Sequence, residues 1–215
     1  MSDSAYEAVC KARRQVDGGN PEGATETLRT YLSSDPDAVS PRLELARILV
    51  YKLEKRAEGI EQLEIILSAD PDNIDALKAS TTVRMTDKKY RKDVDADYQH
   101  LIGLTPESDR SEYAKVCAAY AVFLRKQMVD FPKAAEYYEK AIAADPEAYE
   151  YHQDYAVLLL HDIKDYIKAK QELEEVLRLK PNSLSARKNY DLLMKTKFDA
   201  DGNLKKKGFM SRFRH

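Results

Sequence analysis

Small and large apolar side chains recur along this chain at fixed distances before each of five prolines. Twelve residues before the proline stands a small residue in four cases of five, and eight residues before it stands a large, largely apolar one. A third position, five residues before the proline, is also apolar or aromatic. Separations of four and three residues place these positions on one helical face. Because proline lacks the N–H that a further turn needs and restricts the residue before it, the pattern predicts a helix ending just before each proline.

The spacing of the prolines is nearly constant, at 35, 35, 40 and 35 residues. The prolines are Pro36, Pro71, Pro106, Pro146 and Pro181. The small position holds Ala24, Gly59, Val94, Ala134 and Ala169, and the large position holds Leu28, Leu63, Tyr98, Tyr138 and Leu173. A period in this range predicts a chain built by stacking one small unit.

A second set of small residues predicts another helix in each unit. Ala46, Thr81 and Ala156 each come ten residues after a proline, and Ala121 comes fifteen after Pro106. Each unit is therefore expected to be helix, turn, helix. The five extra residues of the fourth unit belong to the stretch 106–115, as a longer loop or an extended helix.

Other residues predict where individual helices begin. Asn20-Pro21 and Ser40-Pro41 are expected to be an N-cap followed by the first helical residue, and Pro132 after Asp130 is expected to act similarly. Residues 183–197 form one more amphipathic pattern, and a final helix of this kind would cap the apolar face of the last unit.

These features resemble the tetratricopeptide repeat, a helix–turn–helix unit of about 34 residues. The small, large and proline positions carry the resemblance, most closely in residues 130–148 and 165–183. It covers residues 3–197 and implies an all-α solenoid of five helix pairs in a right-handed superhelix. The chain departs from the family pattern in having no Trp, in Val94, and in one extra residue in most turns between paired helices.

We therefore expect a repeat domain over residues 1–197, followed by a flexible basic tail over 198–215. The tail has a formal charge of +3, so the rest of the chain carries about −5. No apolar run is long enough to cross a membrane, and the N-terminus lacks the features of a signal peptide. With Cys10 and Cys117 interpreted as thiols on helices, the cytoplasm is the expected location.

No motif in the chain predicts catalysis. Gly-rich phosphate loops, nucleophile elbows and paired-His helix motifs are absent from the sequence. His152 and His161 stand nine residues apart, on opposite sides of one helix, so they cannot share a metal there. We expect neither an enzyme nor a cofactor or metal ion.

The resemblance implies that the first helices of the pairs line a concave groove that binds an extended peptide. One row of aligned positions then holds Val9, Leu43, Lys78, Ala118 and Gln153, and the next row holds Arg13, Arg47, Thr82, Val122 and Val157. The candidate groove residues are Arg13, Arg47, Lys78, Arg125 and Lys126. Arg binds carboxylates bidentately, so an acidic partner would be favoured. The alternative is that these are ordinary solvated side chains.

A subfamily of such repeats clamps the terminal carboxylate of chaperones with a Lys/Asn, Asn, Lys/Arg set. Of the positions that correspond here, only Lys78 agrees, so the resemblance does not favour that ligand.

The tail offers a second candidate surface. Its basic and aromatic residues are Lys205, Lys206, Lys207, Phe209, Arg212, Phe213 and Arg214. Such a mixture attracts an anionic membrane or nucleic acid, although one tail without a second signal gives only weak anchoring. The alternative is a solubilising terminus.

The sequence thus favours a non-catalytic scaffold or adaptor that binds a protein segment in its groove. The alternative is an assembly or surface-association protein that uses the basic tail or self-association.

Overall fold

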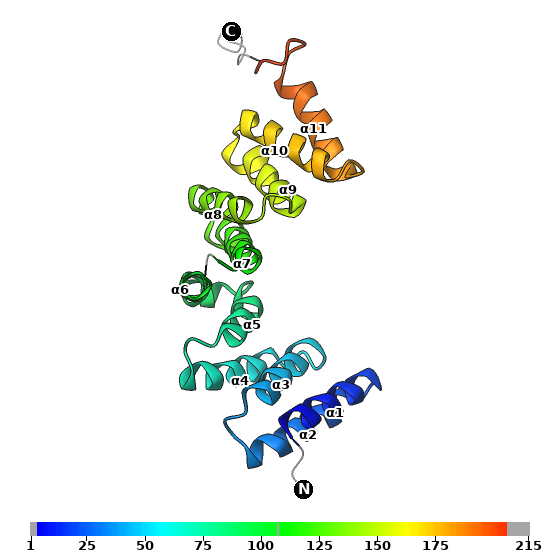
Figure 1. Cartoon of the computed structure of the whole chain (residues 1–215), viewed down its shortest axis with the longest axis vertical. Coiled ribbons are helices and arrows are strands. Elements are labelled where there is room, and N and C mark those ends of the chain that lie inside the picture. The colour runs from blue at the N-terminus through cyan, green and yellow to red at the C-terminus, as the bar shows by residue number, and fades with distance from the viewer. Residues whose placement is uncertain (1–3, 107, 206–215) are drawn as a thin grey trace, which may run out of the picture. The chain divides into compact units, whose positions relative to one another are not determined.

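The computed structural model describes residues 4–106 and 108–205, and most of them are helical (Figure 1). The described residues form eleven α-helices, a short 3₁₀ segment (η1) and two π-helical segments (η2 and η3). In chain order they are α1 (Ala5–Asp17), α2 (Pro21–Ser34), α3 (Val39–Tyr51), α4 (Arg56–Ala69), α5 (Ile74–Arg84), η1 (Lys88–Tyr90), α6 (Arg91–Leu104), α7 (Arg110–Phe123), η2 (Leu124–Met128), α8 (Phe131–Ala144), α9 (Tyr149–Leu158), η3 (Leu159–Ile163), α10 (Tyr166–Leu179) and α11 (Leu184–Lys197). The expectation of an all-α solenoid is confirmed.

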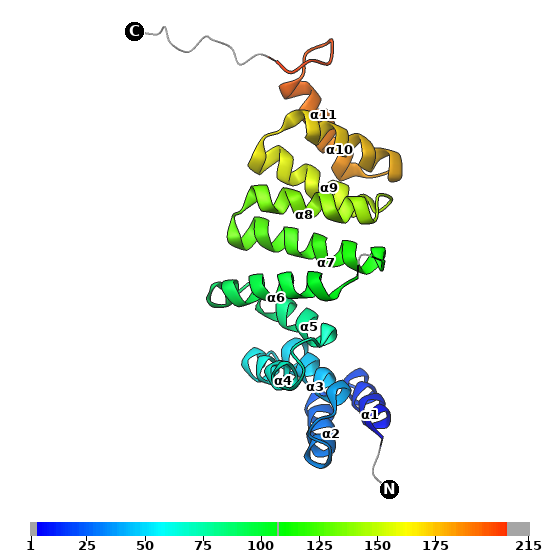
Figure 2. The ribbon, with the colours of Figure 1, turned by 60° about the vertical axis from the view of Figure 1, so that its left-hand side comes forward.

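The helices are divided between two compact units. Unit 1 ends at Leu104 and contains the pairs α1/α2, α3/α4 and α5/α6. Unit 2 begins at Thr105 and contains the pairs α7/α8 and α9/α10, with α11 packed on α10. Within each unit, every helix contacts the next one along the chain, so the pairs form a stack (Figure 2).

Each second helix of a pair ends two residues before its proline, as in α2 at Ser34 and α4 at Ala69. The residue just before the proline still donates its N–H to the helix; Asp70, for example, donates to the Ile66 carbonyl at 2.8 Å. The proline that follows has no N–H to donate, so the helix stops there.

Small residues make the close contacts between paired helices. Ala24, Gly59, Val94, Ala134 and Ala169 are all buried, as are the five large residues four positions later. At Gly59 a Cβ would collide with Val50 and would lie 3.1 Å from the Ala46 carbonyl oxygen. A larger residue at Gly59 would therefore push α4 away from α3.

The extra residue in the turns between paired helices has a defined conformation. In four repeats, the residue seventeen positions before the proline has positive φ: Gly19 (80°), Glu54 (57°), Val129 (58°) and Lys164 (65°). In unit 2 this residue follows a π-helical segment, η2 or η3, which widens the last turn of the first helix. The third repeat has η1 at this place instead.

The five extra residues of the fourth repeat mainly lengthen a helix. Together α7 and η2 cover residues 110–128, whereas α9 and η3 of the fifth repeat cover only 149–163. Of the two possibilities that the sequence left open, the extended helix accounts for most of the insertion.

Two of the three predicted helix starts agree with the structure. Asn20 caps α2 ahead of Pro21, and Asp130 caps α8 with Pro132 in its first turn. The prediction for Ser40-Pro41 was wrong, because α3 already begins at Val39. Pro41 is tolerated inside the first turn since the N–H groups there have no partner within the helix.

Val129 gives a direct test of the turn. A β-branched residue with positive φ is strained, and left-handed backbone costs an L-residue about 1–2 kcal/mol. We expect Val129→Gly to raise the free energy of unfolding by up to about 1 kcal/mol, after the extra entropy of Gly in the unfolded chain is subtracted. Urea denaturation measures this.

The control is Gln171→Gly, at an exposed position in the interior of α10. That change should lower the stability by about 1 kcal/mol, because Gly is a poor helix former. A loss of stability in both variants would contradict the strain at Val129.

Candidate binding site

A hollow of about 390 Å³ lies on the first-helix face of unit 1. Its rim carries Arg13 from α1, Arg47 and Tyr51 from α3, and Asp75 from α5. Its apolar lining consists of Leu43, Ala46, Leu63, Ala79 and Val83. The small side chains at Ala46 and Ala79 leave the space, and the charged residues surround it.

Arg13 and Arg47 are brought together by a carboxylate that the sequence analysis missed. Arg13 donates to Glu44 Oε2 at 3.0 Å, and Arg47 donates to Glu44 Oε1 at 2.7 Å. The Glu44 side chain is only 4% exposed, whereas those of Arg13 and Arg47 are 57% and 59% exposed. The spacing of Glu44 and Arg47, three residues apart on one helix, was the available sequence signal.

The electrostatics of Glu44 keep it ionised. Burial by itself raises the pKa of a carboxyl group, but the hydrogen bonds from Arg13 and Arg47 outweigh it and hold the pKa of Glu44 below its usual value. The buried carboxylate thus orients two guanidinium groups that remain largely in solvent. Because Glu44 and Asp75 offset the two arginines, the hollow has a polar pattern and little net charge.

The remaining groove candidates lie elsewhere. Lys78 is half-buried on α5 and is outside the lining of the hollow. Arg125 and Lys126 belong to η2 in unit 2. Arg125 donates to Asp162 of η3 at 2.6 Å, which ties the fourth repeat to the fifth, while Lys126 is exposed.

Most of the tail candidates lie outside the described residues, namely Lys206, Lys207, Phe209, Arg212, Phe213 and Arg214. Lys205 is described, and its ammonium donates to the Lys195 carbonyl at 2.7 Å. This contact places the ammonium at the last turn of α11, where a helix favours positive charge.

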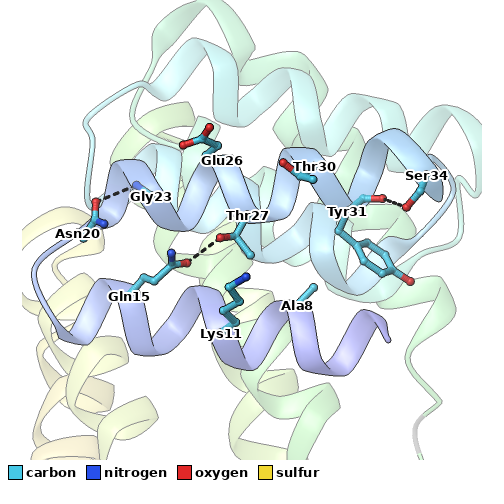
Figure 3. A pocket seen from close by; sticks show the side chains of 10 residues that line it. All are labelled: Ala8, Lys11, Gln15, Asn20, Gly23, Glu26, Thr27, Thr30, Tyr31 and Ser34. Carbon is cyan, nitrogen blue, oxygen red and sulfur yellow. Dashed lines mark hydrogen bonds between the residues drawn. The ribbon is translucent and has the colours of Figure 1, made fainter. Parts of the chain in front are cut away.

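A second hollow, of about 520 Å³, lies between α1 and α2 and is mainly polar (Figure 3). Gln15 and Thr27 are hydrogen-bonded across it at 2.9 Å. The two first helices can be aligned on their buried alanines, Ala12 in α1 and Ala46 in α3. In this alignment Lys11 corresponds to Leu45, and Gln15 corresponds to Leu49.

Leu45 and Leu49 are buried in a core cluster with residues of α1 and α2, so the same positions of α1 would face a preceding repeat. The polar lining in Figure 3 is therefore unlike a contact between repeats, and the hollow has the character of a solvated end face.

His152 has a structural role that the sequence did not indicate. Its ring nitrogens lie 2.7 Å from Glu172 and 3.0 Å from the carbonyl of Pro146. Arg42 occupies the same place in the second repeat and donates to Gln62 and to the carbonyl of Pro36. In both repeats, a side chain six residues after the proline thus connects the proline turn to the second helix of the pair that follows, which is α4 for Arg42 and α10 for His152.

No other chemistry is apparent in the described part of the chain. Residues 4–106 and 108–205 contain no cluster of His, Cys, Asp or Glu that could hold a metal ion. None of their helices has the length and apolar character needed to span a membrane.

Comparisons with known proteins agree with this architecture. The tetratricopeptide repeat model matches residues 126–187, which run from within η2 through α8, α9 and α10 into the start of α11. No curated protein matches the sequence.

Three solved structures illustrate the similarity of fold. MamA residues 41 to the end, from Desulfovibrio magneticus RS-1, superpose with a TM-score of 0.70 at 19% identity, covering 86% of this chain and 99% of MamA. A tetratricopeptide repeat protein from Parabacteroides merdae gives 0.72 at 16% identity, covering 89% and 72% of the two chains. PilF of Pseudomonas aeruginosa gives 0.68 at 20% identity, covering 89% and 83%.

The buried carboxylate of the hollow can be tested by Glu44→Gln. This change leaves two arginines without their counter-charge, so we expect the free energy of unfolding to fall by about 1–3 kcal/mol. Glu58→Gln is the matched control, because Glu58 also accepts from Arg29 and Lys55 but is 41% exposed. Its effect on stability should be clearly smaller, because ion pairs of an exposed carboxylate contribute little. Equal losses in urea denaturation would remove the special role of Glu44.

His152 predicts a pH dependence of stability. Burial lowers its pKa, but the hydrogen bonds to Glu172 and the Pro146 carbonyl, with the charges of Glu172 and Glu175, raise the pKa above its usual value. A raised pKa in the folded state means that this stabilisation is complete below about pH 6.5 and is lost as the pH rises through the folded value.

We therefore expect the wild-type chain to be less stable at mildly alkaline than at mildly acidic pH, measured by urea denaturation. In His152→Gln that difference should shrink, since Gln does not titrate. A difference of the same size in the variant would show that another group causes it.

Proposed function

We propose that this chain, which is a tetratricopeptide repeat protein, is a non-catalytic scaffold that binds a segment of another protein on its first-helix face. The observation that carries the proposal is the hollow of unit 1, where an apolar lining adjoins two guanidinium groups held by one buried carboxylate. An adaptor role in the cytoplasm is part of the same proposal.

The hollow suits a peptide ligand because the guanidinium groups at its rim are already oriented by Glu44. The contacts with Glu44 use one terminal nitrogen of Arg13 and one of Arg47, and the other N–H groups of each guanidinium stay available. Holding these side chains in place before binding lowers the entropy that a partner must offset. The apolar lining would receive one aliphatic or aromatic side chain of the partner.

The charges around the hollow favour a bound segment whose acidic group lies on the side of Arg13 and Arg47. Arg13 and Arg47 lie on α1 and α3, whereas Asp75 lies on α5. A partner carboxylate would be attracted to the arginine side and repelled from the Asp75 side. We therefore propose a segment with an acidic residue, or a terminal carboxylate, next to an apolar one.

The alternative functions receive less support. The end face between α1 and α2 is polar, which does not favour stacking of copies through that surface. Association with a membrane or nucleic acid through the tail stays a prediction, because Lys205 is the one candidate residue of the tail within the described part of the chain.

The proposal is tested by affinity capture from native lysate with mass spectrometry. Charge reversal in R13E/R47E should abolish capture of the partner, because it removes both donors and adds repulsion. Ala79→Phe should also weaken capture, since the larger ring would fill the hollow without altering any charge. Circular dichroism and thermal melting would show that each variant is folded.

The matched control is K11E/R14E, which makes the same charge change on α1 outside the hollow. It should retain the partner. Capture that survives both R13E/R47E and Ala79→Phe would overturn the proposed site.

A further inference from the structure

Positive charge in unit 1 is concentrated in two short segments, 52–56 and 84–92. These segments contain eight of the fifteen Lys and Arg residues of positions 1–104, but only two of the nineteen Asp and Glu residues. The rest of the unit is therefore strongly acidic. Such separation of charge produces a positive potential over a limited area of the surface. We call this area the basic edge; it consists of Lys52, Lys55, Arg56, Arg84, Lys88, Lys89, Arg91 and Lys92.

The two segments of the basic edge meet in the fold. They are the links between α3 and α4 and between α5 and α6. Arg56 donates to the Val83 carbonyl, and both its terminal nitrogens lie 3.3 Å from the hydroxyl of Thr86. Tyr90 packs against a core cluster that includes Ala46 and Val83. The third repeat has η1 in place of the left-handed turn, and η1 itself contributes Lys88 and Lys89.

The cations of this edge are only partly neutralised by the protein itself; Lys55 pairs with Glu58 at 3.3 Å. Lys52, Lys88, Lys89 and Lys92 are exposed, and none of them has a carboxylate within ion-pair distance among the described residues. Arg84 is 8% exposed and pairs with Glu64. The Nε–H groups of Arg56, Arg84 and Arg91 are buried and have no acceptor in the described part of the chain. The exposed ammonium groups, and not these buried Nε–H groups, can reach an external ligand, and they favour one rich in anionic oxygen atoms.

Three classes of anionic ligand can be compared for this edge: single-stranded nucleic acid, a membrane surface and an acidic polypeptide. The ring of Tyr90 has Lys89 at 4.4 Å and Arg84 at 5.0 Å from its centroid, so it is already occupied by cations. Single-stranded nucleic acid is held by bases that stack on open aromatic rings. Binding in a membrane interface needs exposed apolar side chains, and the basic edge has none. An acidic polypeptide requires neither feature.

We propose that the basic edge is a second docking surface, which binds an Asp- or Glu-rich segment of a partner protein. The contacts are ion pairs with exposed lysines, so association is fast and sensitive to salt. This surface adjoins the hollow, since Arg56 donates to the carbonyl of Val83, but it shares none of the residues that line the hollow. It would hold an acidic segment whether or not the hollow is occupied.

The test measures binding of a fluorescein-labelled poly-Glu peptide to the full chain by anisotropy, at low and at physiological ionic strength. The intact chain should bind the peptide, and more weakly as salt rises. K88E/K89E/K92E should weaken binding by about tenfold or more, because three attractions become repulsions. K88Q/K89Q/K92Q should give an intermediate loss, and it carries the test if the charge-reversed variant does not fold.

Two controls separate this proposal from general charge effects and from the hollow. K11E/K115E/K195E changes the net charge equally at exposed positions that are not part of the edge, and should weaken binding by less than about threefold. R13E/R47E, which disables the hollow, should weaken poly-Glu binding far less than K88E/K89E/K92E does, because the arginines lie outside the edge.

Three results would overturn the proposal. The first is an equal loss in K11E/K115E/K195E, and the second is a loss in R13E/R47E without one in the edge variant. The third is that the intact chain prefers phosphatidylserine vesicles or a single-stranded oligonucleotide to poly-Glu. Failure of R13E/R47E to lose its captured partner would affect only the proposed function.

Discussion

Close approach of neighbouring helices over small side chains is the constraint on which this structure depends. Where α4 crosses α3, Gly59 leaves no room for a Cβ, and the buried alanines at the same position of other repeats act similarly. Each contact brings the next large residue, such as Leu63 or Leu173, into the core. Because only one face of each helix is used in this way, the first helices keep a face that is free to carry charged groups.

The turns between paired helices show how local strain is accommodated by the stack. In four repeats the additional residue of the turn is accommodated by a residue of positive φ, and in unit 2 by a π-helical segment as well. Val129 and Lys164 adopt this conformation although neither is glycine, so the packing of the flanking helices must outweigh the local cost. The third repeat uses η1 instead, and that segment places Lys88 and Lys89 of the basic edge.

Buried polar groups decide the chemistry of the exposed surfaces. Glu44 is nearly inaccessible, yet it determines the orientation of two arginines that solvent reaches. His152 and Arg42 bind the carbonyl of a proline and thereby hold the turn between repeats. Glu44 and His152 are themselves buried, so in both cases a group inside the stack fixes the position of groups nearer the surface.

The sequence alone determined the all-α architecture, the period, the proline stops and the buried small and large positions, because these follow from local backbone chemistry and helical spacing. It also indicated that the turns contain an extra residue, but not its left-handed conformation, which depends on the packing of both flanking helices. Only the tertiary structure showed that Glu44 pairs with Arg13, thirty-one residues away in the chain, and that segments 52–56 and 84–92 form one basic edge. Contacts between repeats depend on how the helix pairs stack. A periodic pattern predicts only the contacts made by residue types that recur in every repeat, and Glu44 and the basic edge do not recur.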